Sequence, residues 1–332
     1  MRRICNMTKL LELKKPKAVA EAAAAQKGLH IVLEILIFVA VFIACSFGEM
    51  IIMMPGQMIL MFTDQNYMNA AAAGDMQGIM AATAALAASD AMVVIMLFAN
   101  AGMILVALLF CKLIQKRKMT TVGFQKPGMW KEYLGGLGVG FVIFTVAVLL
   151  CVVTGSLKLQ GLSSTFSIGI FVLFLLGYLI QGMAEEVLCR GYFLVSVSRR
   201  YPLAVGVLAN SVVFAALHLL NNGITVLAFI NLVLFGVFAS VYFIKRGNIW
   251  GVGALHSIWN LAQGNIYGIR VSGMQTSCSI LSSEMVAGRE LINGGDFGLE
   301  GGLAVTIVLI AGTLILLATK QQRYVEEAAA EM

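Results

Sequence analysis

The most prominent feature of the sequence is a series of long apolar runs separated by shorter polar segments. Eight of these runs approach the length of about 20 residues that an α-helix needs to span a bilayer. They occupy residues 30–54, 91–114, 133–154, 166–198, 203–220, 224–244, 249–266 and 302–319. The pattern predicts an all-α, polytopic integral membrane helical bundle with about eight transmembrane helices, since a helix satisfies its own backbone polar groups in lipid.

Composition supports this prediction. The chain of 332 residues is 60% hydrophobic and 12% charged, whereas soluble domains carry about 25% charged residues. The net charge of +6 does not indicate nucleic-acid binding, because the basic residues follow the topology of the predicted helices. Of the 23 Lys and Arg residues, 19 fall on one side of the predicted membrane and Lys158, Arg270 and Arg289 on the other. This split predicts that both termini are cytoplasmic.

The segments between the apolar runs divide the chain into a few regions. We expect cytoplasmic tails at 1–29 and 321–332, with N-terminal transmembrane helices at 30–160. An Ala- and Met-rich outer loop at 55–90 is predicted to be helical near the membrane interface, and a second outer loop covers 267–301. The glycines of GGLGVG at 135–140 suit close helix packing. The six cysteines contain no C-x-x-C pair, so neither a disulfide framework nor a cysteine metal site is predicted.

Polar residues within the apolar runs fall into two groups. His30 and Glu34 lie at the cytoplasmic end of the first run, where they can reach the interface. Glu49 is expected near the outer end of the same run, and a structural role is the simplest interpretation for all three. The second group lies deep in three runs, where charged residues are costly. It comprises Glu185, Glu186 and Arg190 in MAEEVLCRGYF, Phe214 and His218 in FAALH, and His256 and Asn260 in HSIWN.

Helical spacing indicates which of these deep residues share a face. Glu186 and Arg190 are four residues apart and can neutralise each other, whereas Glu185 points into a neighbouring sector. His256 and Asn260 share a face for the same reason. Measured along the helices from the nearest cytoplasmic turn, Glu185, His218 and Asn260 lie at about 20–26 Å, so they can converge at one level.

Convergence of these groups suggests a hydrolytic site. A carboxylate beside a histidine can deprotonate a water molecule, and a second histidine with an asparagine amide can stabilise an oxyanion. The same residues, as Glu185, His218 and His256, could instead bind Zn²⁺ and leave a position for water. Two other interpretations are a hydrogen-bonded network that only fixes helix packing and an ion-coupled transporter, although the sequence has no paired inverted halves.

The motifs EExxxR, FxxxH and HxxxN, in this order, resemble those of the CPBP family of intramembrane proteases. This family includes the CAAX prenyl endopeptidase and its bacteriocin-processing and immunity relatives. In this chain the motifs are E185-E186-V-L-C-R190, F214-A-A-L-H218 and H256-S-I-W-N260. The resemblance covers about residues 165–320 and implies a protease core there. It also implies cleavage of a peptide bond in a membrane-associated protein or peptide, within a multi-pass protein of the bacterial plasma membrane.

The resemblance further implies a role for each motif residue. Glu185 and His218 would activate the attacking water, His256 and Asn260 would stabilise the oxyanion, and Glu186 and Arg190 would support Glu185. The family has been described both as metalloproteases and as glutamate proteases without a metal. We favour the metal-free mechanism, because HxxxN suits an oxyanion site and H-E-x-x-H is absent from the sequence. A family member that is a non-catalytic immunity or scaffolding protein is the main alternative.

Overall fold

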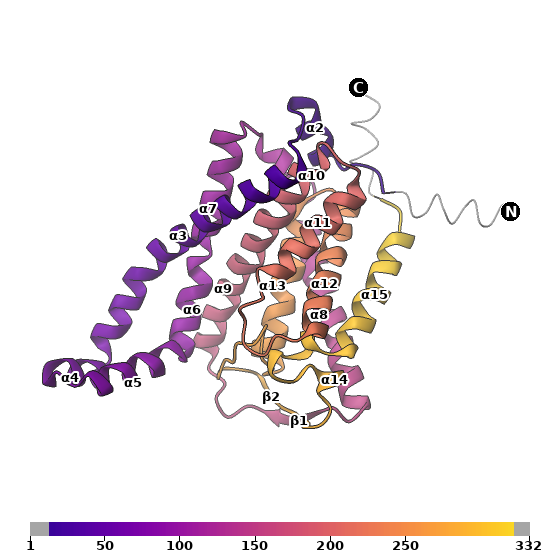
Figure 1. Ribbon diagram of the computed structural model, residues 1–332. Helices are drawn as coiled ribbons and strands as arrows, with labels where there is room; N and C mark the ends of the chain where they lie inside the picture. The colour runs from indigo at the N-terminus through magenta and orange to yellow at the C-terminus, as the bar shows by residue number, and fades with distance from the viewer. Residues whose placement is uncertain (1–12, 322–332) are drawn as a thin grey trace.

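The structure is a computed structural model that describes residues 13–321, and its helices form a bundle (Figure 1). Each of the eight predicted runs coincides with a helical segment, so the all-α prediction is confirmed. These segments are α3 (Ile31–Thr63), α6 and α7 (Asp90–Ala99, Ala101–Leu109) with η1 (Phe110–Ile114), α8 (Met129–Val153), α9 (Ile168–Glu186) with η3 (Val187–Leu194) and α10 (Val195–Ser198), α11 (Leu203–Ala216), α12 (Val226–Arg246), α13 (Ile249–Leu261) with η4 (Ala262–Ile266), and α15 (Leu303–Ala318).

Five helical segments within the described residues are long and apolar enough to cross a membrane. They cover 31–63, 90–114, 129–153, 168–198 and 226–246. The apolar helices α11 and α15 are shorter, and α13 lies buried among its neighbours. The protein is therefore a polytopic helical membrane protein in which some helices expose apolar faces and others, such as α13, are enclosed by the bundle.

Local sequence signals set the ends of the helices that carry the site. The Thr225 side chain accepts a hydrogen bond from the backbone N–H of Ala228 and begins α12, and the Asn248 side chain begins α13 through the N–H of Gly251. Gly247 ends α12 with φ of 69°, a left-handed conformation that glycine adopts without steric cost. A sharp turn of two residues thus joins these antiparallel helices.

Helix α13 is held close to both α8 and α9 by glycine contacts. A Cβ atom at Gly136 would lie 2.0 Å from the carbonyl oxygen of Gly251, and one at Gly140 would lie 2.4 Å from that of Leu255. Both glycines belong to GGLGVG, so the predicted packing role of this stretch is confirmed. A Cβ atom at Gly182 of α9 would similarly lie 2.5 Å from the backbone nitrogen of Ser257. Only small residues permit backbones to approach this closely.

The first long helix differs from its prediction. α3 continues through Pro55 to Thr63, so Glu49 lies near the middle of the helix rather than near its outer end. Glu34 also differs, because it is fully buried and forms an ion pair with Arg199 at 3.3 Å instead of reaching the interface. Beyond α3, the short helices α4 (Gln65–Ala73) and α5 (Met76–Ala87) lie away from the rest of the bundle (Figure 1).

A small antiparallel ribbon lies at the end of the bundle opposite the described chain ends (Figure 1). It pairs β1 (Leu157–Leu162) with β2 (Leu281–Met285), two strands that the apolar pattern did not predict. At the other end, Gln321 and the backbone of Lys14 hydrogen-bond to each other, so the two described ends are adjacent. The remaining short elements are α2 (Lys17–Ala25), η2 (Met119–Val122), α14 (Glu290–Asn293), η5 (Gly295–Phe297) and η6 (Leu299–Gly301).

Candidate functional site

The three motif segments meet in the interior of the bundle. The last turn of α9 carries Glu185 and Glu186, and α13 carries His256 and Asn260. His218 lies just after the end of α11. The contact between Gly182 and Ser257 brings α9 against α13 within one turn of both acidic residues and of His256. Backbone proximity at this crossing is therefore what lets side chains from the two helices bond directly.

Four of the predicted residues line one cavity of about 160 Å³. They are Glu185, His218, His256 and Asn260, and they come from three different helical segments. Glu186 and Arg190 lie behind this cavity and have no exposed surface. The structure thus brings all six predicted residues together, four at the cavity wall and two beneath it.

Glu186 is the centre of a buried charge network. Its Oε1 atom accepts a hydrogen bond from Arg190 Nη1 at 2.6 Å, the ion pair that the spacing predicted. The same Oε1 atom lies 2.9 Å from His256 Nδ1. Because an ionised carboxylate only accepts hydrogen bonds, Nδ1 carries the proton. Glu186 therefore fixes both the arginine on its own helix and the orientation of the imidazole ring on α13, and the latter contact was not predicted.

The two carboxylate oxygens of Glu185 have different surroundings. Its Oε1 atom accepts a hydrogen bond from Gln181 Nε2, and Gln181 Oε1 accepts one from Asn260 Nδ2 at 2.9 Å. Its Oε2 atom is buried and has no hydrogen-bond partner among the described residues. The nearest ionisable partner of Oε2 is His256 Nε2 at 3.8 Å, beyond hydrogen-bond distance. Glu185 is therefore held by one oxygen and has the other free for a further donor.

His218 is oriented by its own helix. Its Nδ1 atom lies 2.9 Å from the carbonyl oxygen of Phe214, and a carbonyl can only accept. The ring thus carries a proton on Nδ1, and in the neutral imidazole the Nε2 atom is the acceptor. No hydrogen bond joins His218 to Glu185 within the described part of the chain. The two groups share the cavity without direct contact.

Aromatic rings enclose the charged network. The Phe214 ring stacks on Phe235 with centroids 5.7 Å apart, and Phe235 meets the His256 ring edge-on at 4.9 Å. The Arg190 guanidinium lies 4.7 Å from the centroid of Phe214, a favourable cation–π geometry. The FxxxH motif therefore contributes a packing residue as well as the histidine.

Gln181 and Glu300 are among the polar residues of the site that sequence reasoning missed. Gln181 connects Glu185 to Asn260, and its position four residues before Glu185 on α9 was the available signal. Glu300 also lines the cavity. Its Oε2 atom accepts hydrogen bonds from the backbone and hydroxyl of Ser272, and its Oε1 atom accepts one from Trp259 Nε1. Glu300 comes from a glycine-rich loop far along the chain, so no helical spacing could connect it to the motifs.

Both helices that carry the site change geometry directly after their motif residues. The chain passes from α-helix into the wider π-helix at Val187, after Glu186, and again at Ala262, after Asn260. Such π turns often occur at functional sites, and no residue pattern in the sequence predicted them. They change the direction of the side chains that follow, including Arg190.

A zinc site formed by Glu185, His218 and His256 is the alternative that the sequence leaves open. Within residues 13–321, no group of three His, Cys, Asp or Glu side chains is placed so that it could hold a metal ion. Glu186 already bonds His256 Nδ1 and Arg190. The arrangement of Glu185, His218 and His256 therefore does not fit a three-ligand metal site.

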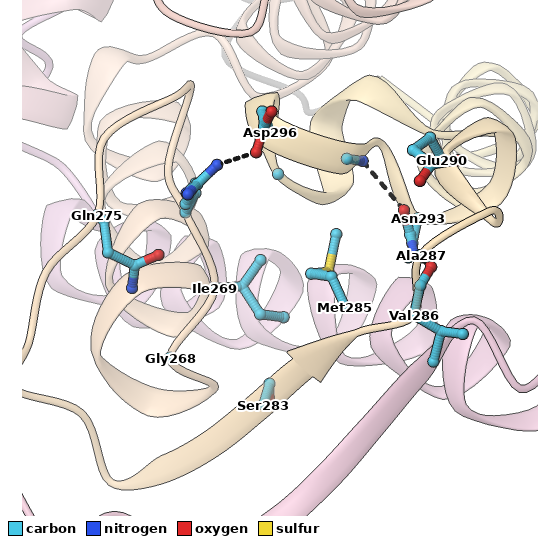
Figure 2. A pocket seen from close by; sticks show the side chains of 13 residues that line it. Gly268, Ile269, Gln275, Ser283, Met285, Val286, Ala287, Glu290, Asn293 and Asp296 are labelled. Carbon is cyan, nitrogen blue, oxygen red and sulfur yellow. Dashed lines mark hydrogen bonds and ion pairs between the residues drawn. The ribbon is translucent and has the colours of Figure 1, made fainter.

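A second cavity of about 340 Å³ is lined in part by the segment that follows η4 (Figure 2). Gly268, Ile269 and Arg270 line this cavity, whereas the next residues, Val271 and Ser272, line the first one. Its charged side chains include Glu290 and the ion pair between Arg270 and Asp296. It has no histidine in its wall, whereas the first cavity is lined by both His218 and His256.

Comparison with known proteins gives a match that covers the segment carrying the motif residues. The chain matches the family model described as type II CAAX prenyl endopeptidase Rce1-like over residues 167–262. The matched segment includes all six predicted site residues, from Glu185 on α9 to Asn260 on α13. No curated protein and no solved structure matches the chain. Over this segment, the chain is similar to the type II CAAX prenyl endopeptidases of the Rce1-like family.

Proposed function

We propose that the protein is an intramembrane endopeptidase that hydrolyses a peptide bond of a membrane-associated protein or peptide. The observation that carries the proposal is the single cavity lined by Glu185, His218, His256 and Asn260. The Rce1-like segment supports the reaction class, and the long apolar helices support a bilayer environment.

Glu185 and His218 are assigned the activation of water. Glu185 Oε2 has no hydrogen-bond partner among the described residues, and in the neutral form of His218, whose Nδ1 donates to Phe214, the Nε2 atom is a hydrogen-bond acceptor. A water molecule between these two acceptors would donate both of its protons toward them and present an oxygen lone pair to the scissile carbonyl carbon. The absence of a direct Glu185–His218 bond within the described chain suits a water that bridges them.

His256 and Asn260 are assigned the stabilisation of the oxyanion. Asn260 Nδ2 gives one of its two hydrogens to Gln181, which leaves the other for the substrate. His256 donates Nδ1–H to Glu186, so donation from Nε2 as well requires the imidazolium form. Donors placed where negative charge develops lower the barrier more than they stabilise the substrate.

The proton balance of the reaction is complete with these groups. The water oxygen forms the new C–O bond while its proton passes to Glu185 or His218. When the tetrahedral intermediate collapses, the C–N bond breaks and the leaving amine takes that proton. The products are a carboxyl end and an amino end, and the side chains return to their starting forms. Glu186 and Arg190 act as positioning residues, because Glu186 holds the ring of His256.

The proposed mechanism is of the glutamate type without a metal, and zinc dependence is its alternative. Support comes from the donor arrangement, which within residues 13–321 contains no group of three metal-ligating side chains. The proposed setting is a bacterial plasma membrane with both termini cytoplasmic. The asymmetry of basic residues supports this orientation, as does the adjacency of the two described chain ends.

The test uses purified full-length protein in liposomes and a mixture of synthetic apolar peptides of about 20 residues, the length of one transmembrane helix. New peptide ends are quantified by mass spectrometry for the wild type, Glu185→Gln and His218→Ala. We expect cleavage by the wild type and a loss of about 10²–10⁴-fold in each variant, at matched thermal stability. Equal cleavage by wild type and Glu185→Gln would contradict the assigned mechanism.

A further inference from the structure

The cavity that holds the proposed catalytic residues has an exposed part and a buried part. Its most exposed wall residues are Met96 of α6 and Met274 of the segment after η4, which keep 40% and 37% of their surface accessible. Phe235 of α12 and His256 of α13 line the same cavity and are buried. We call the part of the wall formed by Met96 and Met274 the mouth of the cavity, because a peptide passes these side chains before it reaches His256.

The mouth lies toward the end of the bundle that carries the β1–β2 ribbon, here called the ribbon end (Figure 1). Helix α6 begins at Asp90, whose carboxylate accepts hydrogen bonds from the backbone of Ser277 and Cys278 in the segment that leads to β2. Met96 follows six residues later, about 9 Å along the helix. Met274 belongs to the same segment between η4 and β2. Both mouth residues are therefore close to the ribbon end.

Two loops of the ribbon end meet beside the mouth and line the same cavity. Asn221, from the loop after α11, and Ser272, from the segment after η4, both belong to the cavity wall. The Nδ2 atom of Asn221 donates a hydrogen bond to the Ser272 carbonyl oxygen at 3.0 Å. Gly273 has φ of 88°, and a Cβ atom there would lie 2.1 Å from the carbonyl oxygen of Asn222, so only glycine permits this approach. The loop that begins with His218 is thus fixed against the segment that carries Met274.

The cavity is closed toward the other end of the bundle, where the described chain ends lie. The ion pair between Glu186 and Arg190 is buried beneath the cavity. Every residue from Val187 to Ser198 is also buried, over about 18 Å at the rise of an α-helix. Among the described residues, those of the turns at 199–202 and 245–248 do not line the cavity. A peptide that approached from this end would have to displace a buried ion pair, which is strongly unfavourable.

Basic residues indicate which side of the membrane the mouth faces. Of the 23 Lys and Arg residues, Lys158, Arg270 and Arg289 belong to segments of the ribbon end, namely β1, the segment after η4 and the residue before α14. The 19 residues on the opposite side give the excess of positive charge that is typical of a cytoplasmic face. The ribbon end, and the mouth with it, therefore faces away from the cytoplasm.

We propose that substrates reach the cavity from the outer face of the membrane, so that they are exported peptides or the outer segments of membrane proteins. The inference rests on the proposed endopeptidase function and on the proposed orientation. It excludes the end of a cytoplasmic protein as substrate, because such a chain would approach the closed side of the cavity. The two methionines suit the passage of an apolar segment, since their unbranched side chains adapt to different neighbours.

The first test compares right-side-out and inside-out membrane vesicles that contain the full-length protein. The probe is a synthetic apolar peptide with a charged flank at one end, which keeps it on the side of addition because charges cross a bilayer at high cost. Cleavage is counted as new peptide ends formed by wild type and not by Glu185→Gln. We expect at least about tenfold more cleavage in right-side-out vesicles, and an equal rate after both are dissolved in detergent. Equal or faster cleavage in inside-out vesicles would overturn the proposal.

The second test locates the mouth by cysteine labelling and needs no substrate. Met274→Cys is compared with Lys126→Cys, an exposed position in the loop before α8 at the end opposite the ribbon. Both are made in a Cys5→Ser background, because the cysteines of the described residues are buried. We expect a membrane-impermeant maleimide to label Met274→Cys in right-side-out vesicles and Lys126→Cys in inside-out vesicles. The reverse pattern would overturn the proposal.

The two tests separate failure of this inference from failure of the proposed function. Cleavage that depends on Glu185 but is faster in inside-out vesicles would leave the endopeptidase in place and reject entry from the outer face. No such cleavage even in detergent would count against the endopeptidase, while the labelling would still show which side the mouth faces. Bound maleimide should also block cleavage in Met274→Cys and not in Lys126→Cys, when each variant is compared with itself before labelling.

Discussion

Helix α3 and the continuous segment α9–η3–α10 are both long, apolar and interrupted by acidic residues, yet their surroundings are opposite. From Glu186 to Arg199 every residue of the second segment is buried, and its charges are bonded within the bundle. Most of α3 is exposed along its apolar face, for example at Ile51 and Ile59, and Glu49 is unpaired among the described residues. Hydropathy identifies both as membrane helices, but only charge spacing distinguishes the helix that carries the site.

The largest effect should follow from removing one partner of the buried network. Arg190→Met leaves Glu186 buried without its cation, so we expect a loss of about 3–5 kcal/mol in stability. The double variant Glu186→Gln/Arg190→Met should lose less, because no uncompensated charge remains. Thermal unfolding in detergent measures both.

The exposed ion pair between Lys158 and Glu284, with N–O distance of 3.7 Å, provides the control. Lys158→Met should change stability by no more than about 1 kcal/mol. Equal destabilisation by Arg190→Met and Lys158→Met would contradict the difference drawn between interior and exposed charges.

The next effect concerns catalysis rather than stability. Asn260→Ala removes one proposed oxyanion donor and leaves Glu185 without its link through Gln181. We expect a fall of about 10²–10³-fold in kcat, with KM less affected. Steady-state kinetics in liposomes measure this. A KM effect with unchanged kcat would assign Asn260 to substrate binding instead.

A moderate effect should follow from separating α9 and α13. Gly182→Ala places a Cβ atom 2.5 Å from the backbone nitrogen and hydroxyl of Ser257, so we expect a loss of about 1–3 kcal/mol. Activity should fall as well, since the contact between Glu186 and His256 depends on this approach. Gly138→Ala on α8, where nothing lies within 4 Å, is the matched control. Because alanine favours the helix over glycine, a loss in Gly182→Ala no larger than the change in Gly138→Ala would contradict the role assigned to this close contact.

The smallest effect is expected from metal removal. Because no three ligating side chains cluster within the described residues, chelation should leave peptide cleavage by the purified protein unchanged. Elemental analysis of active protein, before and after chelation, provides the measurement. Near-stoichiometric zinc, with activity lost on chelation and restored by zinc, would replace the metal-free mechanism.

Much of the architecture could be predicted from the sequence, because bilayer thickness imposes a length on each apolar run. The pair Glu186–Arg190 was also predictable, since i, i+4 spacing on one helix is a local property. The contact between Glu186 and His256 depends on how α9 crosses α13 and has no local signal. The β1–β2 ribbon pairs strands more than a hundred residues apart, and no residue pattern in the sequence predicted the π turns. The first run was predicted to end at residue 54, whereas α3 continues through Pro55 to Thr63.

The most direct test of the central claim compares protein termini in host cells that lack their own copy of the protein. The cells are supplied with wild type or Glu185→Gln at equal membrane levels, and new termini are identified by mass spectrometry. We expect a set of termini that appears only with wild type. Identical termini in both, with any wild-type phenotype preserved by Glu185→Gln, would contradict the peptidase mechanism and favour a non-catalytic immunity or scaffolding role.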